Sequence, residues 1–116
     1  MGKILLVDEN FREGLVSGLV SKLGHNYDIA KSNQELTKLV TTVPYSLILS
    51  TLFLGLDNVF SNAQSSRTNS VVNTNTPFVV HTFSPNPTLV QEASKYDVEV
   101  IGHDKDSIGA VIRRYI

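Results

Sequence analysis

The sequence predicts an α/β fold in which a five-stranded parallel sheet is doubly wound, with helices on both faces. Short apolar runs alternate with segments of helical spacing, five times along the chain. The strand-like runs are continuous rather than alternating, which is typical of strands buried on both faces. Such alternation implies right-handed crossovers between parallel strands. The chain has 116 residues, of which 41% are hydrophobic and 18% charged, so we expect a single domain over residues 1–116.

The first half of the chain predicts three strands and two helices. Residues 3–8 form the first strand, and Asn10 is a candidate N-cap for a helix that Gly24 ends. The other elements are a strand at 27–30, a helix capped by Ser32 or Asn33 and ended by Pro44, and a strand at 47–51.

The second half is less regular at its start. Residues 52–76 are rich in Ser, Thr and Asn, whose side chains compete with helical hydrogen bonds. We therefore expect a short, poorly formed helix there and a long mobile connection. The remaining elements are a strand at 78–82, a turn at 84–87, a helix from Leu89 to Tyr96, a strand at 98–101, a loop at 102–104 and a last helix with an apolar stripe from Ile108 to Tyr115.

Chemically active side chains follow the predicted strands at their carboxyl ends, the edge where open α/β sheets bind ligands. Asp8 and Glu9 end the first strand, and such neighbouring carboxylates are best explained by a hard cation such as Mg²⁺, which takes oxygen ligands. The third strand ends in Ser50 and Thr51, where a third acid would be expected. The residues expected to gather at this edge are Asp8, Glu9, Thr51, Thr82 and His103.

Composition excludes several classes of function. Ten basic and eleven acidic residues give a net charge of −1, and no basic cluster exceeds Arg113–Arg114, so we expect no direct nucleic-acid binding. The absence of cysteine excludes thiol catalysis and Cys-ligated zinc, and His25, His81 and His103 lack metal-ligand spacing. There is no apolar run of about 18 residues and no signal-peptide pattern, so we expect a cytoplasmic protein without a membrane span.

In these features the chain resembles the response-regulator receiver domain of two-component signalling, over essentially its whole length. The matching segments are Lys3 to Asn10, with the family's acidic pair; Tyr45 to Thr51, the strand of the phosphoacceptor aspartate; Pro77 to Thr82, the strand that ends in the switch hydroxyl; and Val98 to Asp104, the strand and loop of an invariant lysine. The resemblance implies a CheY-like, flavodoxin-like fold with strand order 2-1-3-4-5. It also implies a bacterial signalling protein.

The match is uneven at the phosphorylation site. Asp8 and Glu9 stand where the resemblance places Mg²⁺-binding acids, and Thr82 matches the switch hydroxyl. Thr51 stands in the place of the phosphoacceptor aspartate, and His103 in the place of the lysine. Phosphoryl transfer to a receiver needs a carboxylate nucleophile, a metal and a cation, whereas threonine cannot form an acyl phosphate and an unperturbed imidazole is mostly neutral at physiological pH. The sequence therefore predicts a degenerate pocket that has lost phosphotransfer.

Further departures and alternatives surround this pocket. Phe83 replaces a small residue, Val100 an aromatic switch residue, and Asp104 a proline. Asp57 is an alternative acceptor, but it lies in the loop after the strand, and Ser50 points to the opposite side of the strand.

The acidic pair has two interpretations, and Thr51 has one. Asp8 and Glu9 either stabilise the N-terminus of the first helix electrostatically or keep a weak, vestigial cation site. Because one of three carboxylates is missing, we expect no cofactor, with weak Mg²⁺ binding as the alternative. Thr51 is interpreted as a neutral side chain that hydrogen-bonds Thr82 or Asp8.

The leading functional hypothesis is a pseudo-receiver, a non-enzymatic module that acts by phosphorylation-independent contact with a protein partner or linked output domain, or as a homodimer. The resemblance implies an interaction face on the fourth helix, fifth strand and fifth helix, here Leu89, Val90, Tyr96, Asp106, Arg113 and Arg114. The alternatives are a phosphorelay receiver with an unusual site and a flavodoxin-like sensor of a small ligand. An enzyme with Thr51 as nucleophile and His103 as base has little support, because no orienting third group is apparent.

Overall fold

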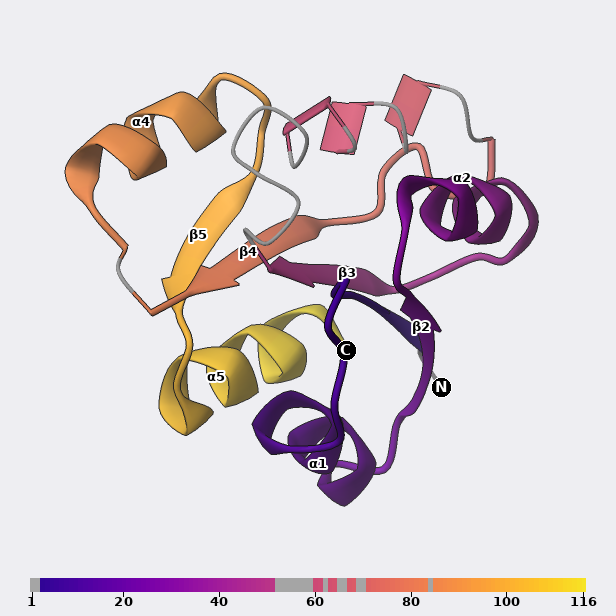
Figure 1. The fold of residues 1–116 in the computed structure, drawn as a ribbon, viewed down its shortest axis with the longest axis horizontal. Coiled ribbons are helices and arrows are strands. Elements are labelled where there is room, and N and C mark those ends of the chain that lie inside the picture. The colour runs from indigo at the N-terminus through magenta and orange to yellow at the C-terminus, as the bar shows by residue number, and fades with distance from the viewer. Residues whose placement is uncertain (1–2, 52–59, 62, 65–66, 69–70, 84) are drawn as a thin grey trace.

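The computed structural model describes residues 3–51, 60–61, 63–64, 67–68, 71–83 and 85–116. Its five strands form one parallel sheet in the order β2-β1-β3-β4-β5, which confirms the predicted fold (Figure 1). The strands are β1 Lys3–Val7, β2 Asn26–Ala30, β3 Leu47–Thr51, β4 Phe78–Thr82 and β5 Glu99–Gly102. The helices with defined bounds are α1 Leu15–Lys22, α2 Asn33–Thr42, α4 Pro87–Ser94 and α5 Lys105–Tyr115.

Two apolar layers enclose the sheet, one on each face. Figure 1 shows α2 and α4 over one face and α1 and α5 over the other. Leu5 and Val7 pack with the first pair of helices, whereas Ile4 and Leu6 pack with the second. Both faces of the central strands are therefore buried, which explains why these strands read as continuous apolar runs. None of the helices that the structure describes is long and apolar enough to cross a bilayer.

The helix after β1 begins later than the sequence predicts. Asn10 does not cap it, because α1 begins at Leu15 with Gly14 as its N-cap. The Asp8 carboxylate instead accepts a hydrogen bond from the Asn10 backbone N–H (2.9 Å), a local turn that competes with helix formation. The Ser17 hydroxyl accepts from the Gly14 N–H (3.0 Å), so a side chain within the first turn satisfies this backbone donor.

The other predicted helix boundaries are close to those observed. Gly24 follows α1 with a φ of 83°, the left-handed conformation that glycine adopts without a steric penalty. Ser32 caps α2 by accepting a hydrogen bond from the Glu35 N–H (3.2 Å). Asp104, at the position of the expected proline, caps α5 by accepting from the Ser107 N–H (2.8 Å). These caps fix the turns that lead into and out of the sheet.

The described residues between β3 and β4 include helical ones, as expected for a short helix in this segment. Phe60 is buried and stacks on Tyr96, with ring centroids 5.1 Å apart. Arg67 donates a hydrogen bond to the Tyr96 backbone carbonyl (2.7 Å). Asp57, the alternative phosphoacceptor, lies outside the described residues together with the rest of 52–59.

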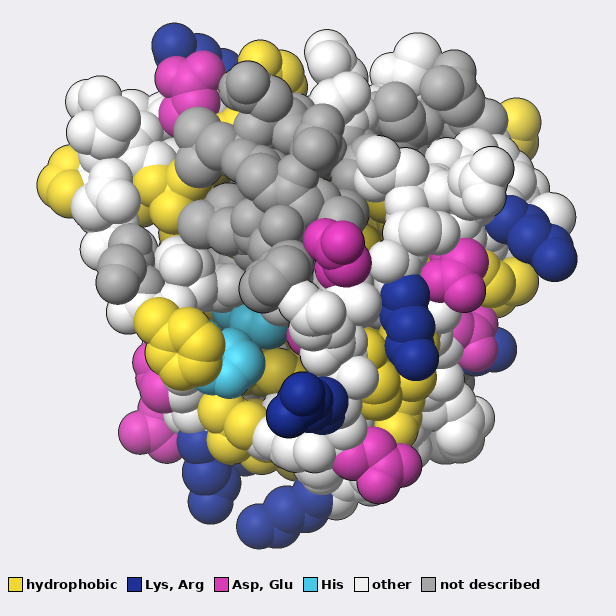
Figure 2. Space-filling model, in the orientation of Figure 1, with side chains coloured by type: hydrophobic (Ala, Val, Ile, Leu, Met, Phe, Trp, Pro, Cys, Tyr) yellow, Lys and Arg dark blue, Asp and Glu magenta, His cyan; other side chains and the backbone are white. Residues whose placement is uncertain are grey.

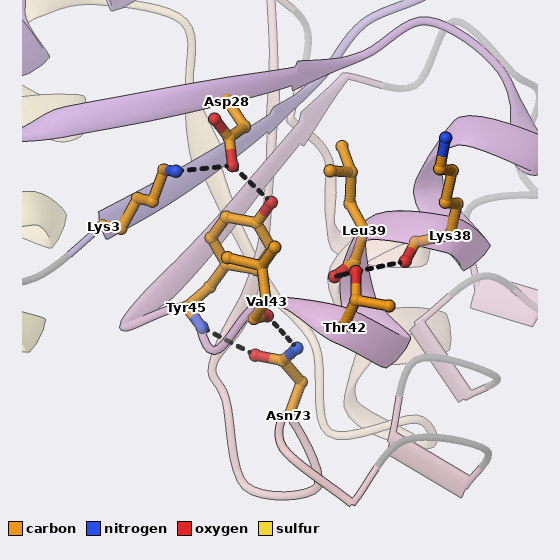
Figure 3. Close-up of polar contacts among 8 residues, drawn as sticks. All are labelled: Lys3, Asp28, Lys38, Leu39, Thr42, Val43, Tyr45 and Asn73. Carbon is orange, nitrogen blue, oxygen red and sulfur yellow. Dashed lines mark hydrogen bonds and ion pairs between the residues drawn. The ribbon is translucent and has the colours of Figure 1, made fainter.

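The connection into β4 ends in a buried polar clamp, which we define as Asn73, Tyr45 and Thr76. Figure 3 shows Asn73 with Tyr45 and Val43. The Asn73 side chain is fully buried, and its Nδ2 donates to the carbonyl oxygens of Val40 (2.6 Å) and Val43 (2.7 Å). Its Oδ1 accepts from the Tyr45 N–H (2.8 Å), and the Thr76 hydroxyl lies 2.9 Å from the same oxygen. The expectation of a mobile connection is therefore wrong for this part of 52–76, because a fully hydrogen-bonded amide is stable when buried.

Candidate functional site

The predicted pocket lies at the carboxyl edge of the sheet, and four of its five predicted residues line one hollow of about 400 Å³. Its lining residues, in the part of the chain that the structure describes, are Asp8, Asn10, Thr51, His81, Thr82, Phe83 and His103. A second hollow of about 240 Å³ shares Asp8, His81 and His103 with it. Glu9 is exposed and is not among the described lining residues.

Asp8 is the carboxylate that the described lining residues contribute to this hollow. Its Oδ1 is engaged by the Asn10 N–H rather than by the N-terminus of α1, which begins seven positions further along at Leu15. Asp8 nevertheless lines the hollow of about 240 Å³ together with Gly14 and Leu15, so the interpretation that Asp8 and Glu9 stabilise the N-terminus of the first helix stays a prediction. Among the described residues, no three His, Asp or Glu side chains are grouped to hold a metal ion. The hollow thus offers Mg²⁺ few of the oxygen ligands it prefers.

Thr51 is the last residue of β3 and stands beside His81 of β4 in the sheet register. It is half-buried and lines the hollow. Ser50 is 1% exposed and points to the other face, as alternation along a strand requires. The hydroxyl of Thr51 therefore occupies the end of the central strand, where the resemblance expects an aspartate. Its predicted hydrogen bond to Thr82 or Asp8 stays a prediction.

Two histidines meet across β4 and β5, a contact that the sequence spacing did not indicate. His81 is 5% exposed, and its Nδ1 lies 2.9 Å from the Nδ1 of His103, which follows β5. The ring centroids are 5.0 Å apart. A hydrogen bond between two ring nitrogens needs one donor and one acceptor, so the pair holds one hydrogen between these atoms. His81 is thus a hydrogen-bonded residue at the edge of the core.

Burial, and then the charge of His103, lower the pKa of His81 from 6.5 to about 4. His81 is therefore neutral at physiological pH. Phe83, which is 84% exposed, covers the outer side of His103 with ring centroids 4.4 Å apart. Figure 2 shows histidine side chains beside hydrophobic ones on this surface. A titratable aromatic cluster thus stands where the resemblance expects a permanent cation.

His81 is the site residue that sequence reasoning missed, whereas Phe83 was noted as a departure beside the pocket. His81 lies inside an apolar run, which favours a core assignment, and it is 22 residues from His103. The usable signal was the strand order: β4 and β5 are neighbours, and His81 pairs with Ile101, two positions before His103. Side chains near the ends of adjacent parallel strands converge.

The predicted interaction face is reduced by the structure. Leu89 is 4% exposed and packs in the core, so its side chain cannot meet a partner. Tyr96 is half-buried beneath its stacking contact with Phe60. Arg114 is exposed but forms an ion pair with Glu99. The predicted residues that the structure leaves exposed are Val90, Asp106, Arg113 and Arg114.

Comparisons with solved structures agree with this architecture. The chain is similar to the chemotaxis protein CheY4 of Vibrio cholerae (18% identity, TM-score 0.85, covering 100% of this chain and 99% of that one). It is also similar to a response regulator from Thermotoga maritima (19% identity, TM-score 0.84, 100% and 98%). A third similar structure is the receiver domain of sensor histidine kinase PA1611 from Pseudomonas aeruginosa (13% identity, TM-score 0.80, 98% and 96%), which has a magnesium ion in its active-site cleft.

No protein-family model matches the chain, and no curated protein matches it in sequence. The similarity to receivers is thus one of fold at low identity. The chain has the fold of a response-regulator receiver domain.

Proposed function

We propose that this chain is a pseudo-receiver: a non-enzymatic signalling module that contacts a protein partner or linked output domain without accepting a phosphoryl group. The observation that carries the proposal is the pairing of His81 with His103 beside Thr51. The five-stranded sheet and its order match those of the receiver fold, whereas the groups that phosphotransfer requires are replaced together.

Three chemical requirements argue against phosphotransfer at this edge. The acceptor must be a carboxylate, and Thr51 presents a hydroxyl. The phosphoryl oxygens need a metal, and the described lining contributes one carboxylate, Asp8. The developing charge needs a cation, and the neutral His81 shares its hydrogen bond with His103 instead. Each loss weakens transfer, and together they favour a role in contact rather than chemistry.

Intact mass after incubation with acetyl phosphate and Mg²⁺ tests the loss of phosphotransfer. We expect no adduct of about 80 Da on the chain. Thr51→Asp is the matched variant, because it restores the carboxylate and leaves the histidine pair in place. An adduct on the wild-type chain would contradict the proposal, and fragmentation would then show whether it lies on Thr51 or on Asp57.

The exposed members of the predicted interaction face are the proposed contact surface. Val90, 47% exposed, offers an apolar contact on α4, and Arg113 offers an exposed cation on α5. We expect Val90→Glu and Arg113→Glu each to weaken binding to a partner, or self-association in sedimentation, without changing the circular dichroism. Lys105→Glu, at the other end of α5, is the control for a general charge effect. Equal loss in all three variants would remove this face from the proposal.

A small-ligand sensor is the second candidate, favoured by the hollow itself. Its volume of about 400 Å³ is within the range of small-molecule sites. NMR with beryllofluoride and Mg²⁺ separates the candidates, since large shifts around Asp8, Thr51 and Thr82 would instead support a working receiver. Shifts with organic fragments alone would favour the sensor.

A further inference from the structure

The two facing imidazoles at the carboxyl edge have a use that does not depend on phosphorylation or on the proposed contact function. Nδ1 of His81 and Nδ1 of His103 point at each other and share a single hydrogen. Nitrogen atoms that converge in this way can bind one metal ion in place of the shared proton, because a metal ligand must present its lone pair. We propose that His81 and His103 bind a divalent transition-metal ion of the Cu²⁺, Ni²⁺ or Zn²⁺ class.

The separation of the two nitrogens fits this class of ion. With metal–nitrogen bonds of about 2.05 Å, an ion that lies to one side of the line between the two nitrogens would meet the observed 2.9 Å separation at a nitrogen–metal–nitrogen angle of about 90°. That is the angle between neighbouring ligands in the square-planar or octahedral geometry of Cu²⁺ and Ni²⁺. Tetrahedral Zn²⁺ would need the nitrogens about 3.3 Å apart, which a small rotation of one ring provides.

Burial makes one ligand rigid and leaves the other adjustable. His81 is 5% exposed within β4, so its ring is held by the sheet and its core neighbours. His103 is half-buried in the turn between β5 and α5, and its backbone N–H donates to the Thr82 carbonyl (2.9 Å). Its ring can therefore turn toward an ion while its backbone stays fixed. Both rings line the hollow of about 400 Å³, which gives an ion access from solvent.

Asp8 is the candidate third ligand. It lines both hollows that the two histidines line. The Asp8 Oδ1 already accepts a hydrogen bond from the Asn10 N–H, and no group of three metal-binding side chains is assembled among the described residues. The proposed protein ligands are therefore the two imidazoles, and water and Asp8 complete the coordination shell when the ion binds. Two imidazoles and one carboxylate suit Cu²⁺, Ni²⁺ and Zn²⁺, whereas Mg²⁺ prefers oxygen alone. On this proposal the pocket prefers these transition-metal ions to Mg²⁺, which is the reverse of the preference of a phosphorylation site.

Metal titration of the untagged, chelator-treated chain tests the site by calorimetry with Cu²⁺, Ni²⁺, Zn²⁺ and Mg²⁺. We expect one ion per chain, with affinity highest for Cu²⁺ and with Ni²⁺ and Zn²⁺ at least about tenfold tighter than Mg²⁺. His103→Gln should weaken Ni²⁺ binding by about tenfold or more, since even outer-shell changes at metal sites cost that much. His25→Gln is the matched control, because His25 is a half-buried histidine in the turn between α1 and β2. Asp8→Asn reports whether the carboxylate joins the shell.

Side-chain NMR of the wild-type chain decides the question even where a variant fails to fold. Zn²⁺ should shift the Nδ1 resonances of His81 and His103 together and leave those of His25 unchanged. The inference is overturned if Zn²⁺ leaves both Nδ1 resonances in place, if Mg²⁺ binds as tightly as Ni²⁺, or if His25→Gln weakens binding as much as His103→Gln. None of these outcomes depends on whether acetyl phosphate modifies the chain, so the two proposals fail separately.

Discussion

The two edges of the sheet hold polar side chains in opposite states. At the amino edge, Asn73 uses both donors and its acceptor within the clamp, and it is fully buried. At the carboxyl edge, His81 and His103 share one hydrogen bond beside an open hollow. Both contacts join segments more than 20 residues apart in the chain.

We interpret this difference as a division of roles, in which the amino edge contributes to stability and the carboxyl edge to function. A buried, satisfied amide holds one geometry, because any opening leaves several backbone groups without partners. An imidazole pair with one buried and one half-buried ring can exchange its shared proton for another ligand with little loss of structure. The amino edge therefore holds β3 and β4 together, and the carboxyl edge is free to differ from that of the receiver domains with a similar fold. Variants at each edge test this division.

The largest effect is expected for Asn73→Ala. The substitution leaves the Tyr45 N–H and the Val40 and Val43 carbonyls without their buried partner, at about 1–3 kcal/mol each when wholly unsatisfied. We expect a loss of about 4 kcal/mol in the free energy of unfolding, measured by urea denaturation. Asn75→Ala, at an exposed asparagine two positions away, should change it by less than about 0.5 kcal/mol. Similar losses in both variants would mean that the clamp has no special role.

The next effect is the pH dependence of stability that His81 confers. The fold lowers the pKa of His81 to about 4 through burial and through His103, so the neutral form is favoured in the folded state. This stabilisation is fully present above the ordinary pKa of 6.5 and is lost as the pH falls toward 4. The full loss is about 3 kcal/mol. The free energy of unfolding, measured with chelator present from about pH 7 to about pH 5, should show most of this loss. This pH range lies above the ordinary pKa values of carboxylates.

The groups around His81 set the controls for this measurement. His103 contacts His81 directly, and Asp8, Arg12 and Glu13 are the charged side chains that line hollows together with it. His81→Gln should abolish the slope, and His103→Gln should reduce it, because His103 contributes the smaller part of the shift. An unchanged slope in His81→Gln would assign the pH dependence to another group.

A smaller effect is expected for Tyr45→Phe. The Tyr45 hydroxyl donates to Asp28 Oδ2 (2.7 Å), a contact visible in Figure 3, and burial followed by Asp28 raises the pKa of this phenol. Removing the hydroxyl should lower the free energy of unfolding by about 1 kcal/mol, since Asp28 is in partial contact with water. Tyr27→Phe, at a half-buried tyrosine, should have less effect. Equal effects would show that the bond to Asp28 contributes little.

The smallest effect is expected for Lys3→Met. Lys3 Nζ lies 3.0 Å from Asp28 Oδ2, but its side chain is 40% exposed, so water screens the pair. The loss should be about 0.5 kcal/mol or less and should fade at high salt. The free energy of unfolding, measured at low and at high ionic strength, tests both the size of the loss and its dependence on salt. A salt-independent loss would point to the packing of the lysine stem instead.

Much of the fold followed from local patterns in the chain. The strands at 47–51 and 78–82 were predicted with their observed bounds. Ser32 caps the start of α2 and Gly24 follows the end of α1, as expected. The start of α1 was wrong, because the turn at Asp8 and Asn10 competes with the helix over a few residues. Local signals of similar strength cannot be ranked from sequence alone.

By itself, the sequence determined the parallel sheet, and with it the gathering of Asp8, Thr51, Thr82 and His103 at one edge. Strand direction and apolar periodicity are local properties, and they place carboxyl ends together whatever the side chains do. Only the tertiary structure decided that Asn73 is a buried clamp rather than part of a mobile loop, and that His81 meets His103. Those contacts depend on which strands are neighbours and which backbone groups lack partners, and both are settled only when distant segments pack.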